Sequence, residues 1–162
     1  MSDAIRIQMV MVEGAQLERL VSDFIDLVGS ERDDTDPAIA RLAPDVYPDD
    51  AEASRAFAAA TRQDLLDRRA VDAETVRIAL SDFRADLQSL SETEALVTQE
   101  IVIPAADVDA WMRTLTAIRL VIASRLDIRG EDDHDPDDPR YGVYDWLGYR
   151  LELVTQAADE LL

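Results

Sequence analysis

The sequence contains no cysteine, no lysine and no asparagine, and it has a single histidine, His134. Without cysteine the chain forms no disulfide, offers no thiolate nucleophile and cannot ligate zinc or an iron–sulfur cluster through sulfur. One histidine also leaves no multi-histidine metal centre. These absences exclude redox sensing by the chain's own thiols and most kinds of zinc enzyme.

Two further features are missing. The five glycines, at positions 14, 29, 130, 142 and 148, stand alone, so the chain has no glycine-rich loop to cradle a phosphate. No stretch approaches the roughly 18 consecutive apolar residues that indicate a membrane-spanning helix. We therefore expect a cytoplasmic protein that holds no nucleotide cofactor and does not enter a membrane.

One acidic stretch resembles the start of a calcium-binding loop, because Asp133, Asp135 and Asp137 alternate with other residues. The match then fails, since Asp138 stands where the loop needs a turn glycine and Tyr144 stands where it needs a bidentate glutamate. We expect a solvated acidic loop and no specific metal site.

Charge is what the chain has in excess. Thirty-five Asp and Glu residues face 16 basic residues, all of them arginine, and the formal net charge is −19. Such a chain is repelled by the phosphates of DNA, where binding affinity comes largely from Lys and Arg. Three roles are open for these acids. They could keep the protein soluble, bind a basic surface on a partner, or mimic nucleic acid toward such a partner.

The hydrophobic pattern predicts a mainly α-helical single domain over 1–162, with about five to six helices. Alternating apolar residues predict strands near 5–12 and 99–103, each followed by a helix, and these strands can pair as a two-stranded ribbon. Two strands alone are marginally stable, so the helices must stabilise the domain. The acidic segments 30–36 and 129–138 are expected to be flexible loops.

Capping signals divide the middle of the chain. Asp36 and Pro37 are the cap and first residue of a short helix that Pro44 closes. Asp49 and Glu52 then resemble a capping box that opens a long helical region.

An unbroken helix over that whole region would exceed the size of a compact domain, so we expect one break. Asp72 is the candidate cap, with Val71 and Val76 as a hydrophobic staple on either side. This interpretation predicts helices over 50–70 and 73–91. The second helix carries an apolar stripe from Val76 to Leu90, and this stripe together with the last helix could also support a homodimer.

The helix from Ala105 to about Ile128 is apolar on most sides, which predicts a central position in the fold. A last helix is expected to open at Pro139. Its apolar face would then cover the central helix.

Two arginines lie in and after the most apolar part of the central helix. A guanidinium near a core is usually paired with a carboxylate, and the last helix offers Asp145 and Glu152. We expect such pairs for Arg119 and Arg125, with binding of an anionic ligand or of a partner's carboxylate as the alternative. Trp146 is expected to lie in the core or to anchor an interface.

Several motifs along the chain carry a family resemblance: Asp36-Pro37, Arg41-Leu42-x-Pro44-Asp45-x-Tyr47-x-Asp49-Asp50, Trp111, Leu115-x-x-Ile118-Arg119-Leu120, Arg125-Leu126-Asp127-Ile128 and Tyr144-Asp145-Trp146-Leu147. This resemblance is to an actinobacterial family long catalogued as a domain of unknown function and named for a proposed oxidative-stress transcriptional regulator (AosR). It implies regulation through contacts with RNA polymerase or a sigma factor. Redox control in that family is attributed to a cysteine pair, which this chain lacks.

We therefore expect a non-enzymatic regulatory protein that acts through protein–protein contacts, with transcription machinery as its partner. The family's genes often lie beside the ClpS proteolysis adaptor, so an adaptor in Clp-linked protein turnover is one alternative. A small-molecule-binding sensor is another, and it requires a concave pocket in which Arg119 or Arg125 is unpaired.

Overall fold

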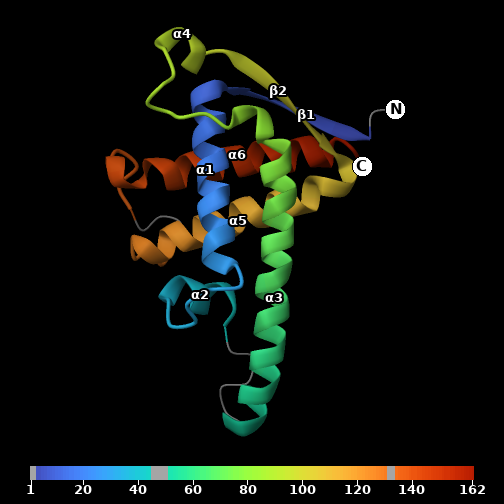
Figure 1. Ribbon diagram of the computed structural model, residues 1–162, viewed down its shortest axis with the longest axis vertical. Helices are drawn as coiled ribbons and strands as arrows, with labels where there is room; N and C mark the ends of the chain where they lie inside the picture. The colour runs from blue at the N-terminus through green and yellow to red at the C-terminus, as the bar shows by residue number, and fades with distance from the viewer. Residues whose placement is uncertain (1–2, 45–50, 131–133) are drawn as a thin grey trace.

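The computed structural model describes residues 3–44, 51–130 and 134–162, which form a set of packed helices with one small antiparallel sheet at one end (Figure 1). In chain order the elements are β1 (Ala4–Val10), α1 (Met11–Val28), α2 (Pro37–Leu42), α3 (Ala51–Ala79), η1 (Ser81–Phe83), α4 (Glu92–Ala95), β2 (Thr98–Pro104), η2 (Ala105–Asp107), α5 (Val108–Arg125), η3 (Pro139–Tyr141) and α6 (Gly142–Asp159), where η marks a 3-10 helix. The expected mainly helical single domain with a two-stranded ribbon is confirmed.

The sheet consists of β1 and β2, which pair antiparallel with Ile5 opposite Ile103. Both isoleucines are buried. The residues that alternate with them along the strands, such as Arg6 and Val102, are exposed on the outer face. On that outer face Arg6 and Glu100 form an ion pair of 2.5 Å. The alternation of apolar and polar residues thus gives the ribbon one face toward the core and one toward solvent.

The first strand is shorter than the expected 5–12. It ends at Val10, and Met11 begins α1 while its backbone N–H donates to the carbonyl of Val97 at 2.9 Å. Met11 and Val12 are apolar, and an apolar pair fits the first turn of a helix as well as the end of a strand. The alternating pattern therefore could not place the boundary.

The helices form two crossed pairs, as Figure 1 shows. Helix α1 packs against α3, and α5 packs against α6, α3 and α2. The ribbon covers one end of this arrangement, and α2 lies toward the other end. No helix in the described part of the chain is both long and apolar enough to cross a membrane.

The core joins all of these elements through large buried side chains. Its largest fully buried members are Met9, Leu17, Val21, Ile39, Leu42, Leu66, Leu80, Phe83, Ile103, Trp111, Leu115 and Leu147. Helix α5 contributes Trp111 and Leu115, which confirms that this helix is central.

The expected break at Asp72 is wrong, because α3 runs unbroken for 29 residues, about 43 Å at 1.5 Å per residue. Asp72 does not cap a helix there. Its carboxylate accepts two hydrogen bonds from Arg113 of α5, at 2.8 and 3.2 Å. Val71 is 68% exposed and so forms no staple. The first turns of α3 extend past α2 in Figure 1, so compactness of the domain did not limit the length of this helix.

The second predicted helix, 73–91, is also wrong beyond Ala79. The chain leaves the helix through η1, where Phe83 is buried, and Asp86 then accepts the backbone N–H of Gln88 in a turn. The stripe therefore correctly predicted the buried residues Val76, Leu80 and Phe83. Only Val76 lies within α3, and Phe83 lies in η1.

The remaining capping signals have mixed outcomes. Asp36 caps α2 by accepting the backbone N–H of Ala38 at 2.9 Å, as expected. The capping box lies partly outside the described residues, because Asp49 is not among them. The same holds for Asp133 in the calcium-like stretch.

The close approach of α1 to η1 requires a glycine. Gly14 lies on α1 directly against the ring of Phe83, and a Cβ atom at this position would fall within that ring. Phe83 is 2% exposed and belongs to the packed core.

We expect Gly14→Ala to lower the free energy of unfolding by about 1–2 kcal/mol, because overpacking at a buried ring costs more than the helix propensity of alanine returns. Gly142→Ala is the matched control, since nothing lies within 4 Å of its Cβ position at the start of α6. Urea unfolding of both variants checks the expectation. A Gly14→Ala variant as stable as the control would contradict it.

Candidate functional site

Helix α5 carries three arginines, and Arg125 at its end is fixed by the cap of another helix. Its guanidinium donates to both carboxylate oxygens of Asp36, at 2.6 and 2.7 Å. Asp36 also accepts the backbone N–H of Ala38, so one carboxylate caps α2 and ties it to α5. The expected partner, Asp145 or Glu152 of α6, was wrong for Arg125, whose carboxylate partner comes from the cap of α2.

This pair shifts the titration of both groups. The hydrogen bond from Arg125 holds the pKa of Asp36 below its ordinary value of 3.8, and the same bond raises the pKa of Arg125. The Asp36 side chain is 17% exposed and that of Arg125 is 49% exposed. Solvent therefore screens part of the attraction, and the pair acts mainly as a geometric tie.

Arg119 is half-buried and contacts α6 without a carboxylate. Its Nε donates to the backbone carbonyl of Tyr144 at 3.2 Å, and its Cζ lies 4.1 Å from the centroid of the Tyr144 ring. The guanidinium also lies against Gly148, where a Cβ atom would come within 3.0 Å of Cζ. The expected carboxylate pairing is therefore wrong for Arg119 within the described residues.

Asp145 and Trp146 face other partners than the two arginines. Asp145 lies 2.8 Å from Nε2 of His134, whose side chain is only 6% exposed. Trp146 is half-buried and packs against the core, with Arg150 5.8 Å from its ring centroid. The four residues singled out from the sequence thus belong to four separate contacts.

A small pocket lies beside Arg119, with a volume of about 220 Å³. Arg41 of α2 and Arg129, just beyond α5, line it together with Arg119. Its other described lining residues are Thr116, Leu120, Ala123, Ile128, Gly130 and Tyr144, so no carboxylate lines it within the described part of the chain.

Sequence reasoning missed Arg41 and Arg129. Arg41 reaches the pocket because α2 packs on α5, and its Nη1 donates to the carbonyl of Ile128 at 3.2 Å. The sequence did contain one signal for the place of Arg119. Gly148 lies four residues after Tyr144 on α6, and a glycine there leaves room for the flat guanidinium of Arg119.

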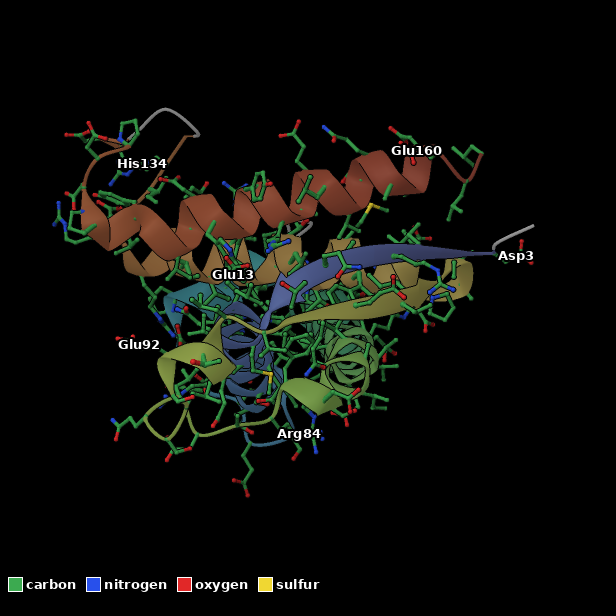
Figure 2. All side chains as sticks on the ribbon, turned by 90° about the horizontal axis from the view of Figure 1, so that it is seen from above. Asp3, Glu13, Arg84, Glu92, His134 and Glu160 are labelled. Carbon is green, nitrogen blue, oxygen red and sulfur yellow. The ribbon has the colours of Figure 1, made fainter. Side chains whose placement is uncertain are left out.

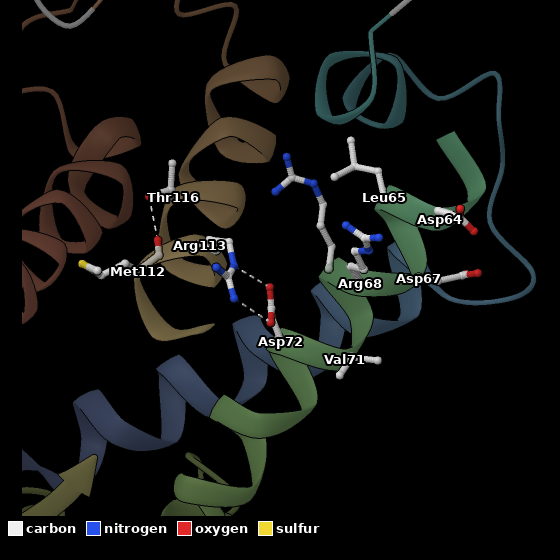
Figure 3. A pocket seen from close by; sticks show the side chains of 10 residues that line it. Asp64, Leu65, Asp67, Arg68, Val71, Asp72, Met112, Arg113 and Thr116 are labelled. Atoms are coloured by element: carbon white, nitrogen blue, oxygen red, sulfur yellow. Dashed lines mark hydrogen bonds and ion pairs between the residues drawn. The ribbon is translucent and has the colours of Figure 1, made fainter. Parts of the chain in front are cut away.

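A larger groove of about 930 Å³ lies between α3 and α5 (Figure 3). Its charges are mixed, and the charged residues that line it are Asp64, Asp67, Asp72, Arg68, Arg69 and Arg113. Arg113 is held by Asp72, as the dashed lines in Figure 3 show, and Asp67 pairs with Arg32 at 3.1 Å. This groove is close to charge balance, unlike the small pocket beside it.

Three carboxyls have lowered pKa values, which do not suit a general acid at neutral pH. Asp33, Asp36 and Asp138 have pKa values below the ordinary 3.8, in each case chiefly through a side-chain hydrogen bond from Thr35, Arg125 and Arg140 respectively. A general acid at neutral pH needs a shift in the opposite direction. These three carboxyls therefore act as structural acceptors in turns and caps.

Comparisons with known proteins add one finding. Residues 1–158 match the model of a family described as a domain of unknown function (DUF2017). No curated protein and no solved structure matches the chain.

Substitutions at Asp36 can separate its contribution as the cap of α2 from its contribution as the ion-pair partner of Arg125. Asn is as good a helix cap as Asp, so Asp36→Asn keeps the cap, removes the ion pair and should lower the free energy of unfolding by about 0.5–1 kcal/mol. Asp36→Ala removes both, for a total loss of about 1–2 kcal/mol. Asp34→Asn, an exposed neighbour, should change little. Denaturant unfolding at neutral pH measures all three.

The same variants have a pH dependence of known sign. The pKa of Asp36 is lower in the folded chain, so its contribution to stability is present above about pH 4 and is lost as the pH falls through the folded pKa. The stability difference between wild type and Asp36→Asn should therefore shrink below pH 4. A difference that stays constant down to pH 2 would show that Asp36 is not stabilised by its ion pair.

Proposed function

The chain belongs to the DUF2017 family, whose description assigns no activity, and we propose that it is a non-enzymatic regulatory protein that acts through contacts with another protein. The observation that supports this proposal best is one exposed surface in which apolar side chains lie among acids. We name it the α4 surface and define it by Val12, Glu92, Glu94, Leu96 and Val97.

The apolar part of the α4 surface is unusually open to solvent. Val12, Leu96 and Val97 are 36%, 68% and 48% exposed. The hydrogen bond from Met11 N–H to the carbonyl of Val97 holds the start of α1 beside the end of the α4 segment. Apolar side chains gathered in this way are typical of a protein contact surface.

The acidic part comes from α4 itself. Glu92 and Glu94 are exposed, and Ser91 caps the short helix by accepting the backbone N–H of Glu94 at 3.1 Å. Figure 2 shows Glu92 on α4, at the outer side of the molecule. An apolar centre with a charged rim is the usual composition of an interface, and acids at the rim favour a basic partner.

The wider charge distribution favours the same kind of partner. Many arginines are engaged with carboxylates inside the chain, including Arg125 with Asp36, Arg113 with Asp72 and Arg32 with Asp67. The excess acids are therefore the charges most available to a partner. They would attract a basic surface from a distance and speed its association.

The partner we propose is transcription machinery in the cytoplasm, either RNA polymerase or a sigma factor, as the resemblance to AosR-type regulators implies. An adaptor in Clp-linked protein turnover is the alternative. Both would use the α4 surface, and the identity of the bound protein distinguishes them.

The α4 surface makes binding dependent on two named charges. We expect Glu92→Gln with Glu94→Gln to weaken binding to purified RNA polymerase holoenzyme by about threefold to tenfold, since an exposed charge pair contributes about 0.2–1 kcal/mol. Glu52→Gln with Glu160→Gln is the matched control, because it removes two exposed acids elsewhere on the chain. Figure 2 places Glu160 on the opposite side of the molecule from Glu92. Biolayer interferometry over a salt series provides the affinities.

Binding should also fall as salt rises, because exposed charges are screened at short range in concentrated salt. Equal losses in the two double variants would mean that net charge matters and the α4 surface does not. Polymerase binding that is insensitive to salt would contradict the acidic mechanism. Failure to bind polymerase or sigma factors, together with binding of a purified Clp component, would replace the leading partner by the alternative.

A further inference from the structure

Two of the three arginines that line the small pocket, Arg41 and Arg119, are held differently from most arginines in the described chain. Arg125, Arg113 and Arg32 each donate to a carboxylate. Arg41 and Arg119 donate instead to backbone carbonyls, those of Ile128 and Tyr144. In a chain with 35 acids, two cations beside one pocket are thus positioned by neutral groups, and neither is paired with a carboxylate of the described residues.

Arg119 is also held in place before any ligand arrives. The Tyr144 carbonyl binds its Nε, the Tyr144 ring lies 4.1 Å from Cζ, and Gly148 lets α6 approach the guanidinium closely. A guanidinium has five N–H donors, of which this arrangement uses one. A side chain already fixed by packing loses little entropy when it binds a ligand.

The rest of the pocket limits the size and chemistry of a ligand. Leu120, Ala123 and Ile128 provide an apolar wall, and the volume of about 220 Å³ suits a small molecule. Guanidinium groups match the planar or tetrahedral oxygens of carboxylates and phosphates. Arg129 also lines the pocket, but it lies 3.5 Å from a carboxylate oxygen of Asp127, so its charge is paired and the site does not depend on it.

We propose that this pocket is a binding site for a small oxyanion, a phosphate or carboxylate group, recognised by Arg41 and Arg119. The site goes beyond the proposed partner contact and does not depend on it. Because Arg41 belongs to α2 and Arg119 to α5, the bound oxyanion joins two elements of the fold. Binding therefore stabilises the folded chain, by an amount that rises with the logarithm of the ligand concentration once this exceeds Kd.

Titration calorimetry of the full chain with inorganic phosphate, and separately with acetate and succinate, tests the site at constant ionic strength. We expect saturable binding at one site in at least one titration, because a chain of net charge −19 repels anions elsewhere on its surface. Saturation by phosphate alone identifies a phosphate site, and saturation by the carboxylates alone identifies a carboxylate site.

Two variants distinguish the pocket from a general effect of charge. Arg41→Gln should weaken binding by about tenfold or more, as expected for a charged hydrogen bond, and Arg41→Lys should recover part of that loss. Arg6→Gln removes the same charge from the outer face of the ribbon, at the other end of the molecule from α2 in Figure 1, and should leave the affinity within about twofold.

Gly148→Ala provides a test that changes no charge. Its Cβ would force the Arg119 guanidinium to move from a 3.0 Å contact, so binding should weaken by severalfold. Thermal unfolding without ligand verifies that each variant is folded. The proposal is overturned if no titration saturates, if Arg6→Gln weakens binding as much as Arg41→Gln, or if neither Arg41→Gln nor Gly148→Ala changes the affinity.

Discussion

The fold depends on covering α5, a helix whose sides are apolar over most of its length. Each of its three arginines contacts a different one of the helices that cover it. Arg113 binds Asp72 of α3, Arg119 binds Tyr144 of α6, and Arg125 binds the cap of α2. Six residues separate each pair, and six residues advance about 240° around a helix, so the three side chains leave α5 in three different directions. One spacing in the sequence thus ties the central helix to three neighbours.

These ties determine the location of the small pocket. The Arg125–Asp36 pair fixes the start of α2 on the end of α5, and this brings Arg41, five residues further along, to the carbonyl of Ile128. Asp127 has a positive φ of 56°, and the N–H of Ile128 returns to the carbonyl of Ala123 at 2.8 Å, which closes the helix. The α5 terminus, α2 and α6 therefore meet around a space that their backbone carbonyls help to define.

Much of this fold could be predicted from local patterns. The alternation in the strands, the cap at Asp36 and the apolar helix after Ala105 are each encoded within a few residues, and each was confirmed. The partners of the arginines were not predictable in this way. Asp72 has the spacing of a helix cap, and only the packing of α3 on α5 shows that it binds Arg113. With 35 acids in the chain, many carboxylates could have paired with Arg119. Its actual partner is the backbone carbonyl of Tyr144, and because every residue has a backbone carbonyl, the residue type does not identify this partner.

The proposed partner contact and the proposed oxyanion site lie on different parts of the molecule. The α4 segment lies near the ribbon, whereas α2 lies toward the other end of the fold in Figure 1. Direct competition between partner and ligand is therefore not expected from their positions. One route for a mutual influence is α1, which contacts α4 and also packs on α3 and α5. By linkage such an influence is reciprocal, so a ligand that strengthens partner binding is itself bound more tightly in the complex. A ligand with equal affinity for the free and the partner-bound chain would stabilise the fold without regulating it.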